Sequence, residues 1–249
     1  MKTILSALFA ISIVYSATAQ QSEFLEFSLG WRNYQVRDEY QSPLRYRGSG
    51  MVRGMGFSVL SQNSLKHFDA DYFSANLKNG QENSSPYEMN GFQYQHSKVY
   101  HFSEQSGVNY FAGIALKVNF GFRGSDYIGG FDTALSLALV GTATYKESPD
   151  NRWTHQAAIR LPFFAWATRP RYTSPSYIKK GNSFNNISHL FLTIPNYFGV
   201  DIQIGSTYYL NNGNAFRFDY RGQYYQILPI RPLRVLTNGF KTTALMKVN

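Results

Sequence analysis

The chain has 249 residues, of which 24 are Lys or Arg and 15 are Asp or Glu, and it contains no Cys. Charged residues make up 16% of the chain, below the roughly 25% of ordinary soluble domains, while Phe, Tyr and Trp reach 17%. This aromatic content argues against disorder, because a disordered chain has little apolar surface to bury. The absence of Cys excludes a disulfide framework, a Cys-ligated zinc site, a thiol nucleophile and a lipid anchor on Cys.

The N-terminus has the features of a secretory signal peptide. Lys2 precedes an apolar run over residues 4–15, and Ala17 and Ala19 occupy the small positions of a cleavage site. The run is shorter than the ~20 residues of a membrane-spanning helix, which favours cleavage over an N-terminal membrane anchor. We therefore expect a signal peptide at residues 1–19 and one mature domain at residues 20–249, with 23 basic and 15 acidic residues and a net charge of +8.

Beyond this segment, apolar and polar residues alternate with the period of two that is typical of β-strands. Residues 216–221 place aromatic side chains at even positions and charged ones at odd positions. The even positions of 110–122 are apolar throughout, with Tyr110 and Phe122 at the two ends. No later window holds 18 uninterrupted apolar residues, so no transmembrane helix is expected.

Two features favour a transmembrane β-barrel over a soluble β-sandwich, whose strands also alternate. The apolar sides commonly extend over five to seven positions, whereas a whole strand in a soluble protein averages only about 5–6 residues. Many of these sides also carry an aromatic residue at one or both ends, which is typical of the girdles at membrane interfaces. The sequence thus predicts an all-β, antiparallel transmembrane β-barrel in the bacterial outer membrane, with a secreted β-sandwich binding module as the alternative.

The predicted connections alternate between tight turns and longer segments. Tight turns fall at 61–63, 104–107, 147–151 and 211–214, and longer connections at 37–47, 78–88, 123–129, 169–187 and 229–234. The strands are expected at 23–36, 45–60, 67–77, 88–103, 109–122, 130–146, 153–168, 188–210, 215–228 and 236–248. The range 188–210 is long for one crossing and contains Pro195, which removes a ladder donor. About ten strands are therefore expected, or twelve if that range forms two elements.

Three soft patterns resemble a known group of proteins. They are Ser-Pro-Leu-Arg-Tyr-Arg-Gly at 42–48, Arg-Leu-Pro-Phe at 160–163 leading to Arg169-Pro170, and the Asn-Asn-Gly hairpin before the Phe-Arg-Phe-Asp-Tyr-Arg segment at 216–221. Together they resemble small uncharacterised outer-membrane β-barrel proteins of the Bacteroidetes group. The resemblance covers most of the mature chain, implies fold and location, and transfers no catalytic residue. The final Asn249 departs from the aromatic residue that usually ends a porin.

The inward parity of the expected strands is rich in charged residues. The side chains assigned to the lumen are Glu26, Arg32, Lys117, Asp132, Lys146, Arg160, Asp201, Arg217, Asp219 and Arg221. If they are paired and buried they fill the lumen as a plug, and if they are spaced around water they select ions. The plug is favoured, because barrels of about eight strands are filled by side chains whereas 16–18-stranded porins leave channels.

The histidines give no strong catalytic or metal site, and no cofactor or metal is expected. His67, Asp69 and Asp71 share one face, but two carboxylates fall short of the six to eight oxygens that calcium prefers, so a polar row facing the lumen is favoured. His155 lies on an apolar face, where a membrane-embedded hydrolase would carry its base. No Gly-x-Ser-x-Gly motif or compact His, Ser and acid cluster accompanies it, which favours an interfacial His in an aromatic girdle.

Basic residues gather in the longer connections, which carry eleven basic and five acidic residues and so account for +6 of the net charge. The longest connection holds Arg169, Arg171, Lys179 and Lys180, with no acidic residue as far as Ile187. We expect these four residues to face lipopolysaccharide, whose phosphates accept charge-assisted hydrogen bonds. A solvated loop surface is the alternative, and nucleic acid is not expected as a partner.

These features predict a non-enzymatic outer-membrane β-barrel that acts as a narrow pore or as an accessory subunit of an envelope complex. Its expected partners are outer-membrane lipid, lipopolysaccharide and other envelope proteins. An outer-membrane lipid or lipopolysaccharide hydrolase is the second hypothesis, and the secreted β-sandwich module is the third.

Overall fold

The computed structural model describes residues 21–39, 44–61, 63–80, 87–125, 128–148, 150–170, 187–229 and 232–248. The segment assigned to the signal peptide, residues 1–19, lies outside this part. Long alternating segments form eleven strands, whose bounds are β1 Ser22–Asp38, β2 Arg45–Ser61, β3 Ser64–Lys78, β4 Tyr87–Gln105, β5 Val108–Ser125, β6 Ile128–Tyr145, β7 Trp153–Pro170, β8 Ile187–Thr193, β9 Tyr197–Tyr209, β10 Ala215–Ile227 and β11 Leu233–Lys247. All of them agree with the expected strands to within three residues, except that the range 188–210 is divided between β8 and β9.

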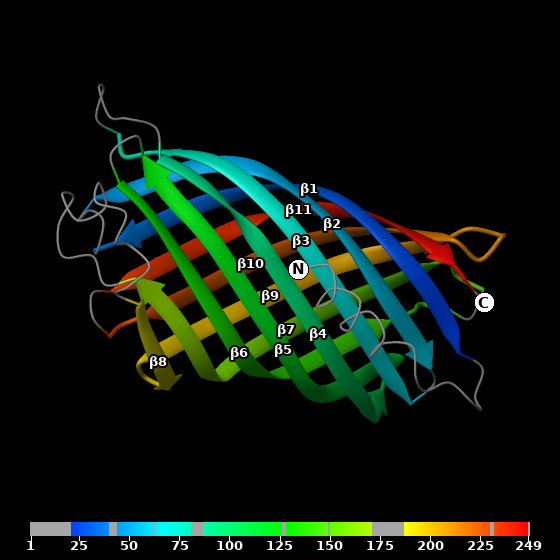
Figure 1. Ribbon diagram of the computed structural model, residues 1–249. Coiled ribbons are helices and arrows are strands. Elements are labelled where there is room, and N and C mark those ends of the chain that lie inside the picture. Colours follow the sequence, from blue (N-terminus) through cyan, green and yellow to red (C-terminus); the bar gives the residue numbers. More distant parts are fainter. Residues whose placement is uncertain are drawn as a thin grey trace.

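The strands close into one antiparallel barrel, and Figure 1 shows them tilted around a common axis. Each strand from β1 to β7 pairs with the next, and β11 closes the barrel by pairing with β1 over Phe24–Asp38. The start of β1 and the end of β11 lie at the same end as the short turns after β2, β4, β6 and β9. We call this the tight-turn end, at the right of Figure 1, and the opposite end the long-connection end.

The split strand does not add a crossing to the barrel. β9 pairs with the first half of β7, from Trp153 to Arg160, and β8 pairs with the second half, from Phe164 to Pro170. Both therefore lie on the same side of β7, with the exposed residues 194–196 between them. Eleven strands thus make ten positions around the barrel, and the expected ten-stranded closure is confirmed.

One predicted connection is wrong. The segment 123–129 was expected to be a long connection, but β5 continues to Ser125 and β6 begins at Ile128, which leaves two residues between them. The glycines that signal a turn are part of the ladder, where Gly124 pairs with Gly129 and Arg123 pairs with Gly130. Glycine has no side chain that would mark the inward or outward face, so the alternation is hidden there.

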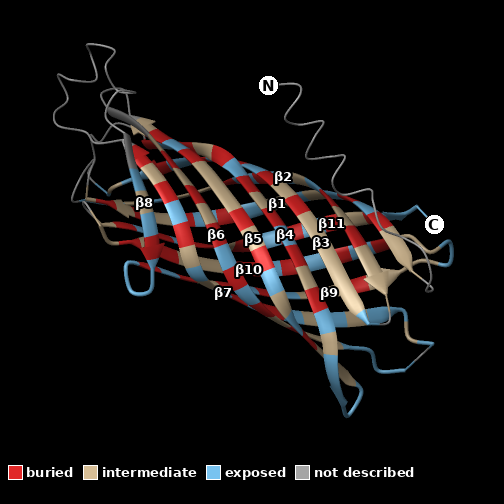
Figure 2. Cartoon of the chain, turned by 60° about the horizontal axis from the view of Figure 1, so that its bottom comes forward, coloured by how far each residue is buried: buried red, intermediate tan, exposed pale blue. Residues whose placement is uncertain are grey.

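Burial alternates along the strands, as the red and pale blue bands of Figure 2 show. Outward residues include Phe240, Phe218 and Ile114, which are 70%, 52% and 60% exposed. The strands other than β8 have 13 to 19 residues, more than the about 9–11 that cross a bilayer. The outward positions become polar toward the long-connection end, beyond Trp31 on β1 and Tyr72 on β3, so the barrel extends out of the membrane at that end.

The inside of the barrel is filled in layers. At the tight-turn end, Phe24, Ala215 and Leu245 form a small apolar cluster. Charged side chains fill the middle. A larger apolar cluster follows toward the long-connection end and includes Tyr34, Leu77, Ile227, Leu233 and Val235. The charged side chains of the middle therefore lie between two apolar clusters.

Candidate functional site

The structure places the expected lumen residues as follows. Nine of them are buried inside the barrel, namely Glu26, Arg32, Lys117, Asp132, Arg160, Asp201, Arg217, Asp219 and Arg221. Lys146 is exposed instead, because β6 ends at Tyr145 and the turn begins there. Sequence reasoning missed Lys241 as a lumen residue and placed Asp38 and Arg123 in the connections, yet all three are buried. We call the buried charged groups between the two apolar layers the lumen network.

Arg217 is central to one part of the lumen network. Its Nη2 donates to Glu26 Oε2 at 2.6 Å, and its Nε donates to Asp219 Oδ2 at 3.0 Å. Asp219 also accepts a hydrogen bond from Gln203 Nε2 at 3.1 Å, and His67 Nε2 lies 3.3 Å from Glu26 Oε2. The guanidinium fork thus joins two carboxylates with charge-assisted hydrogen bonds, which are shorter and stronger than neutral ones.

A second part of the network spans the lumen. Lys241 on β11 donates from Nζ to Asp69 Oδ1 at 2.8 Å and to Asp71 Oδ1 at 2.6 Å, both on β3. Arg221 on β10 donates to Asp69 Oδ2 at 2.7 Å. In the strand order, β10 and β3 are four positions apart in a ring of ten, so this pair connects nearly opposite walls.

A third part lies against β5, β7 and β9. Lys117 Nζ donates to Asp201 Oδ2 at 2.7 Å, and Arg160 donates to Gln203 Oε1 at 2.9 Å. Arg160 also lies within 3.4 Å of Asp201. A cavity of about 20 Å³ lined by Lys117, Arg160 and Asp201 has room for a water molecule. A space of this size accommodates about one water molecule and is too small for a solute.

The expectation that Arg169 faces lipopolysaccharide is wrong. It is buried, and its Nη2 donates to Asp38 Oδ1 at 2.8 Å. The cause is a bulge in β7: Pro162 pairs with Ala138 and Phe164 with Leu137, so Phe163 is one residue too many. A bulge reverses the parity of every later residue on its strand.

Arg169 belongs to an upper cluster of ion pairs at the long-connection end. Arg123 bridges Asp132 and Asp38 there, with 3.5 Å to Asp38 Oδ2. Arg123 and Arg169 come from β5 and β7 and both reach across to β1. The other residues expected to face lipopolysaccharide, Arg171, Lys179 and Lys180, lie outside the described part of the chain.

The bulge also marks a seam in the barrel wall. The ladder of β7 with β9 ends at Arg160, and its ladder with β8 begins at Phe164. Pro162 has no N–H to contribute in between. Gly199 faces it so closely that a Cβ there would lie 2.8 Å from the Pro162 ring. The proline ring and the bare glycine backbone therefore close the wall by packing where hydrogen bonds stop.

On the outer face, the structure brings a serine to His155 that sequence reasoning did not find. His155 Nδ1 lies 2.8 Å from Ser206 Oγ, across the ladder of β7 with β9. The other described contact of His155 is the stacked ring of Tyr145, at 6.3 Å between centroids. Within the described ranges, no group of three or more His, Asp or Glu side chains is arranged to hold a metal ion.

Aromatic side chains form girdles on the outer surface. At the tight-turn end, Phe102 contacts Tyr110 and Trp153 contacts Tyr208. Nearer the long-connection end, Trp166 stacks on Phe191 with ring planes 12° apart. Most outward residues between the two girdles are apolar, such as Leu29, Ile114 and Phe218, which is the pattern of a lipid-facing barrel. Among the residues that the structure describes, no helix is long and apolar enough to cross a bilayer.

The closed ten-stranded barrel, with its apolar exterior and polar interior, defines an integral β-barrel protein of the bacterial outer membrane. Solved structures of this fold class resemble it with little sequence identity. The outer membrane protease OmpT from Escherichia coli is 6% identical over 95% of this chain and 99% of that chain, with a TM-score of 0.51. The translocator domain of the autotransporter NalP from Neisseria meningitidis is 10% identical over 96% and 94% of the two chains, with a TM-score of 0.39. At such identities the likeness shows the fold alone.

No protein-family model matches the chain, and no curated protein matches its sequence. The function must therefore be argued from the barrel itself.

Proposed function

We propose that the protein is a non-enzymatic, closed outer-membrane barrel that serves as an accessory subunit of an envelope complex, in preference to a narrow pore. The observation that supports this most directly is the set of ion pairs across the lumen, in particular Arg221 with Asp69 and Lys241 with Asp71. A conducting pore needs a continuous row of hydrated positions. Here the charged side chains pair with one another across the lumen, and apolar clusters lie on both sides of them. Within the described ranges, single atoms such as Asp71 Oδ2 and Arg221 Nε have no hydrogen-bond partner.

Opening such a lumen is costly. Separating a buried ion pair leaves charges without partners, and removing one partner of such a pair typically costs about 3–5 kcal/mol. Several pairs would have to open together to make a path, so thermal fluctuation alone rarely does so. The barrel is then an anchor and a rigid support for the segments at its long-connection end.

Planar-bilayer recording tests this proposal. We expect the purified mature protein to give no stepwise conductance. The double variant Arg221→Ser/Lys241→Ser, which removes two bridging side chains, should admit ions once its folding is verified by heat-modifiable migration. The variant Arg234→Ser removes an exposed cation from β11 and should stay silent. A regular ohmic conductance from the unmodified protein would refute the closed barrel in favour of the pore.

The accessory role has a separate test. After extraction in mild detergent, light scattering with correction for bound detergent should give a protein mass above that of one chain. A mass equal to one chain in cross-linked and untreated samples alike would argue against a stable complex.

Lipid hydrolysis is a second candidate, which the contact between His155 and Ser206 favours. In such a reaction Ser206 Oγ would attack an ester carbonyl while His155 accepted the serine proton at Nδ1 and returned it to the departing alcohol, before water released the acid. A hydrolase also needs an orienting acid and donors for the oxyanion. Within the described part of the chain, the contacts of His155 include neither.

Lipid extracts from cells decide between the two candidates. We expect His155→Ala and Ser206→Ala to leave the phospholipid and lipid A profiles of the unmodified strain unchanged. A lysolipid or deacylated product that depends on the unmodified protein and disappears in both variants would overturn the non-enzymatic proposal.

A further inference from the structure

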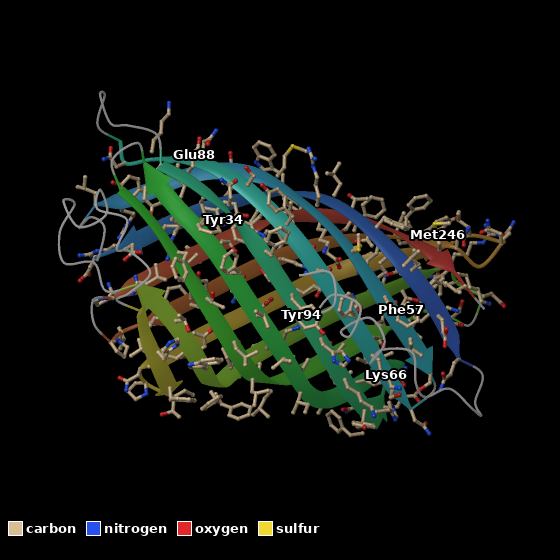
Figure 3. All side chains as sticks on the ribbon, viewed as in Figure 1. Tyr34, Phe57, Lys66, Glu88, Tyr94 and Met246 are labelled. Carbon is tan, nitrogen blue, oxygen red and sulfur yellow. The ribbon has the colours of Figure 1, made fainter. Side chains whose placement is uncertain are left out.

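Two lysines lie directly opposite each other on the lipid-facing wall. Lys66 on β3 and Lys98 on β4 are ladder partners, and both point outward. Figure 3 shows Lys66 toward the tight-turn end of the barrel, whereas Glu88 lies at the other end. Like charges at directly opposed positions of a sheet repel each other and destabilise the pairing.

Apolar side chains flank this pair on the two neighbouring strands. The row continues through Val59 on β2 and Ile114 on β5, so that the two cations lie between two aliphatic side chains. Within the described ranges, neither lysine takes part in an ion pair. The carboxylate of the same row is Glu23 on β1, the ladder partner of Val59, and it lies two strands away from Lys66.

Neighbouring side chains place the pair at a membrane interface. Tyr100, one outward position closer to the tight-turn end, carries Lys98 Nζ over its ring at 4.8 Å. His96 is one outward position in the other direction, opposite Phe68. Aromatic belts lie at the level of lipid headgroups, and long lysine side chains extend toward that level from within the hydrocarbon region.

A phosphate group is the chemical partner that this arrangement fits. A single anion between the two ammonium groups would convert their repulsion into two charge-assisted contacts. The tight-turn end of such barrels faces the periplasm, where the adjacent leaflet consists of phospholipids. The acyl chains of a bound phospholipid would lie along Val59 and Ile114 and then along Phe57, Phe68 and Leu116, the next apolar residues on the outward face.

We propose that Lys66 and Lys98 form a binding site for the phosphate of one anionic phospholipid in the periplasmic leaflet. The two lysines bind the headgroup, Tyr100 positions Lys98, and the apolar wall receives the acyl chains. The site is separate from the lumen and from the basic segment expected to meet lipopolysaccharide at the opposite end.

Native mass spectrometry of the refolded mature protein tests this site, with phosphatidylglycerol and phosphatidylcholine as probes. Each lysine near an anionic lipid surface contributes a factor of about five in affinity, so Lys66→Gln/Lys98→Gln should lose roughly 25-fold in affinity for phosphatidylglycerol. The matched control is Arg53→Gln, which removes an outward cation whose outer-face ladder partners are Leu29 and Tyr72. This control should retain the affinity of the unmodified protein.

A second measurement, of thermal stability, depends on the repulsion between Lys66 and Lys98. Phosphatidylglycerol should raise the temperature at which the unmodified barrel unfolds in zwitterionic detergent, and it should not do so for the double variant. Without the lipid, the double variant should be at least as stable as the unmodified protein, because the repulsion has been removed. Equal binding of phosphatidylcholine and phosphatidylglycerol, or an equal loss in Arg53→Gln, would overturn the proposal.

Discussion

The lumen network makes a quantitative prediction at Lys241. Its Nζ lies 2.6 Å from Asp71 Oδ1, and Asp71 is 1% exposed. The next cations, Arg32 and Arg221, are each 3.8 Å from Asp71 Oδ2, beyond normal hydrogen-bond length. Removing Lys241 therefore leaves Asp71 as a buried carboxylate without its closest partner.

We expect Lys241→Met to lower the free energy of unfolding by about 3–5 kcal/mol, the usual cost of leaving one partner of a buried ion pair unmatched. Met keeps most of the volume of the lysine stem, so the packing change contributes little. Adding Asp71→Asn removes the unmatched charge, and the double variant should recover about 1–3 kcal/mol of that loss. Unfolding by urea in phospholipid vesicles, followed by tryptophan fluorescence, measures each value.

The control is Lys247→Gln, which changes an exposed cation at the end of the same strand. It should alter the unfolding free energy by less than about 0.5 kcal/mol. A loss below about 1 kcal/mol for Lys241→Met would mean that water screens the pair as it does at a surface. The closed, dry lumen would then be refuted.

Three further predictions concern the register, the seam and the outer surface. A cysteine at Asp219 should resist a bulky membrane-impermeant thiol reagent, while one at Phe218 should react with a lipid-soluble probe; the reverse pattern would contradict the register. Gly199→Val should cost about 1–3 kcal/mol by overpacking against Pro162, measured by the same urea titration, whereas an unchanged midpoint would mean that the seam is open. Neutralising Arg171, Lys179 and Lys180 should reduce the lipopolysaccharide retained during purification without unfolding the barrel, and unchanged retention would indicate a solvated loop.

The alternation of the sequence determines most of the architecture. Because side chains alternate strictly along a strand, the pattern of residues 216–221 is enough to place Arg217 and Asp219 inside and Phe218 outside. Strand ends also follow from turn chemistry, as in the Asn-Asn-Gly hairpin between β9 and β10. These are local properties, and a single chain displays them directly.

The ion-pair partners are not local, and the sequence does not display them. Asp69 and Arg221 are separated by 152 residues and meet only because of the stagger between strands around the closed barrel. Parity places both inside without saying that they face each other. For the same reason the sequence did not reveal the contact between Ser206 and His155. It exists because β9 pairs with β7 along the segment that carries His155.

A single inserted residue accounts for the misplaced arginine. From the sequence, Arg169 is expected in the connection after a strand that ends at residue 168, whereas β7 continues to Pro170. With regular alternation from Arg160, position 169 would still point outward. The bulge at Phe163 reverses the later residues, so Ala165, Ala167 and Arg169 are the buried ones. Neither alternation nor turn chemistry marks this position, although Pro162 shows that the ladder is interrupted nearby.

The charged side chains of this barrel fall into two groups, one buried in the lumen and one on the outside. Among the residues that the structure describes, the buried charged side chains comprise seven acids and eight bases, a net charge of +1, and ion pairs join them. A mature chain starting at Gln20 carries +8, so nearly all of the excess positive charge lies on partly exposed side chains or in segments beyond the described ranges. Charges that serve only to fill the lumen can balance one another, so they do not account for an excess of positive charge. Phosphates are the abundant anions at both faces of an outer membrane, and several parallel contacts to them can outweigh the small contribution of each. The interior charges thus pair across the lumen, while the exterior cations, Lys66 and Lys98 among them, are the groups through which we propose that the barrel binds lipid phosphate.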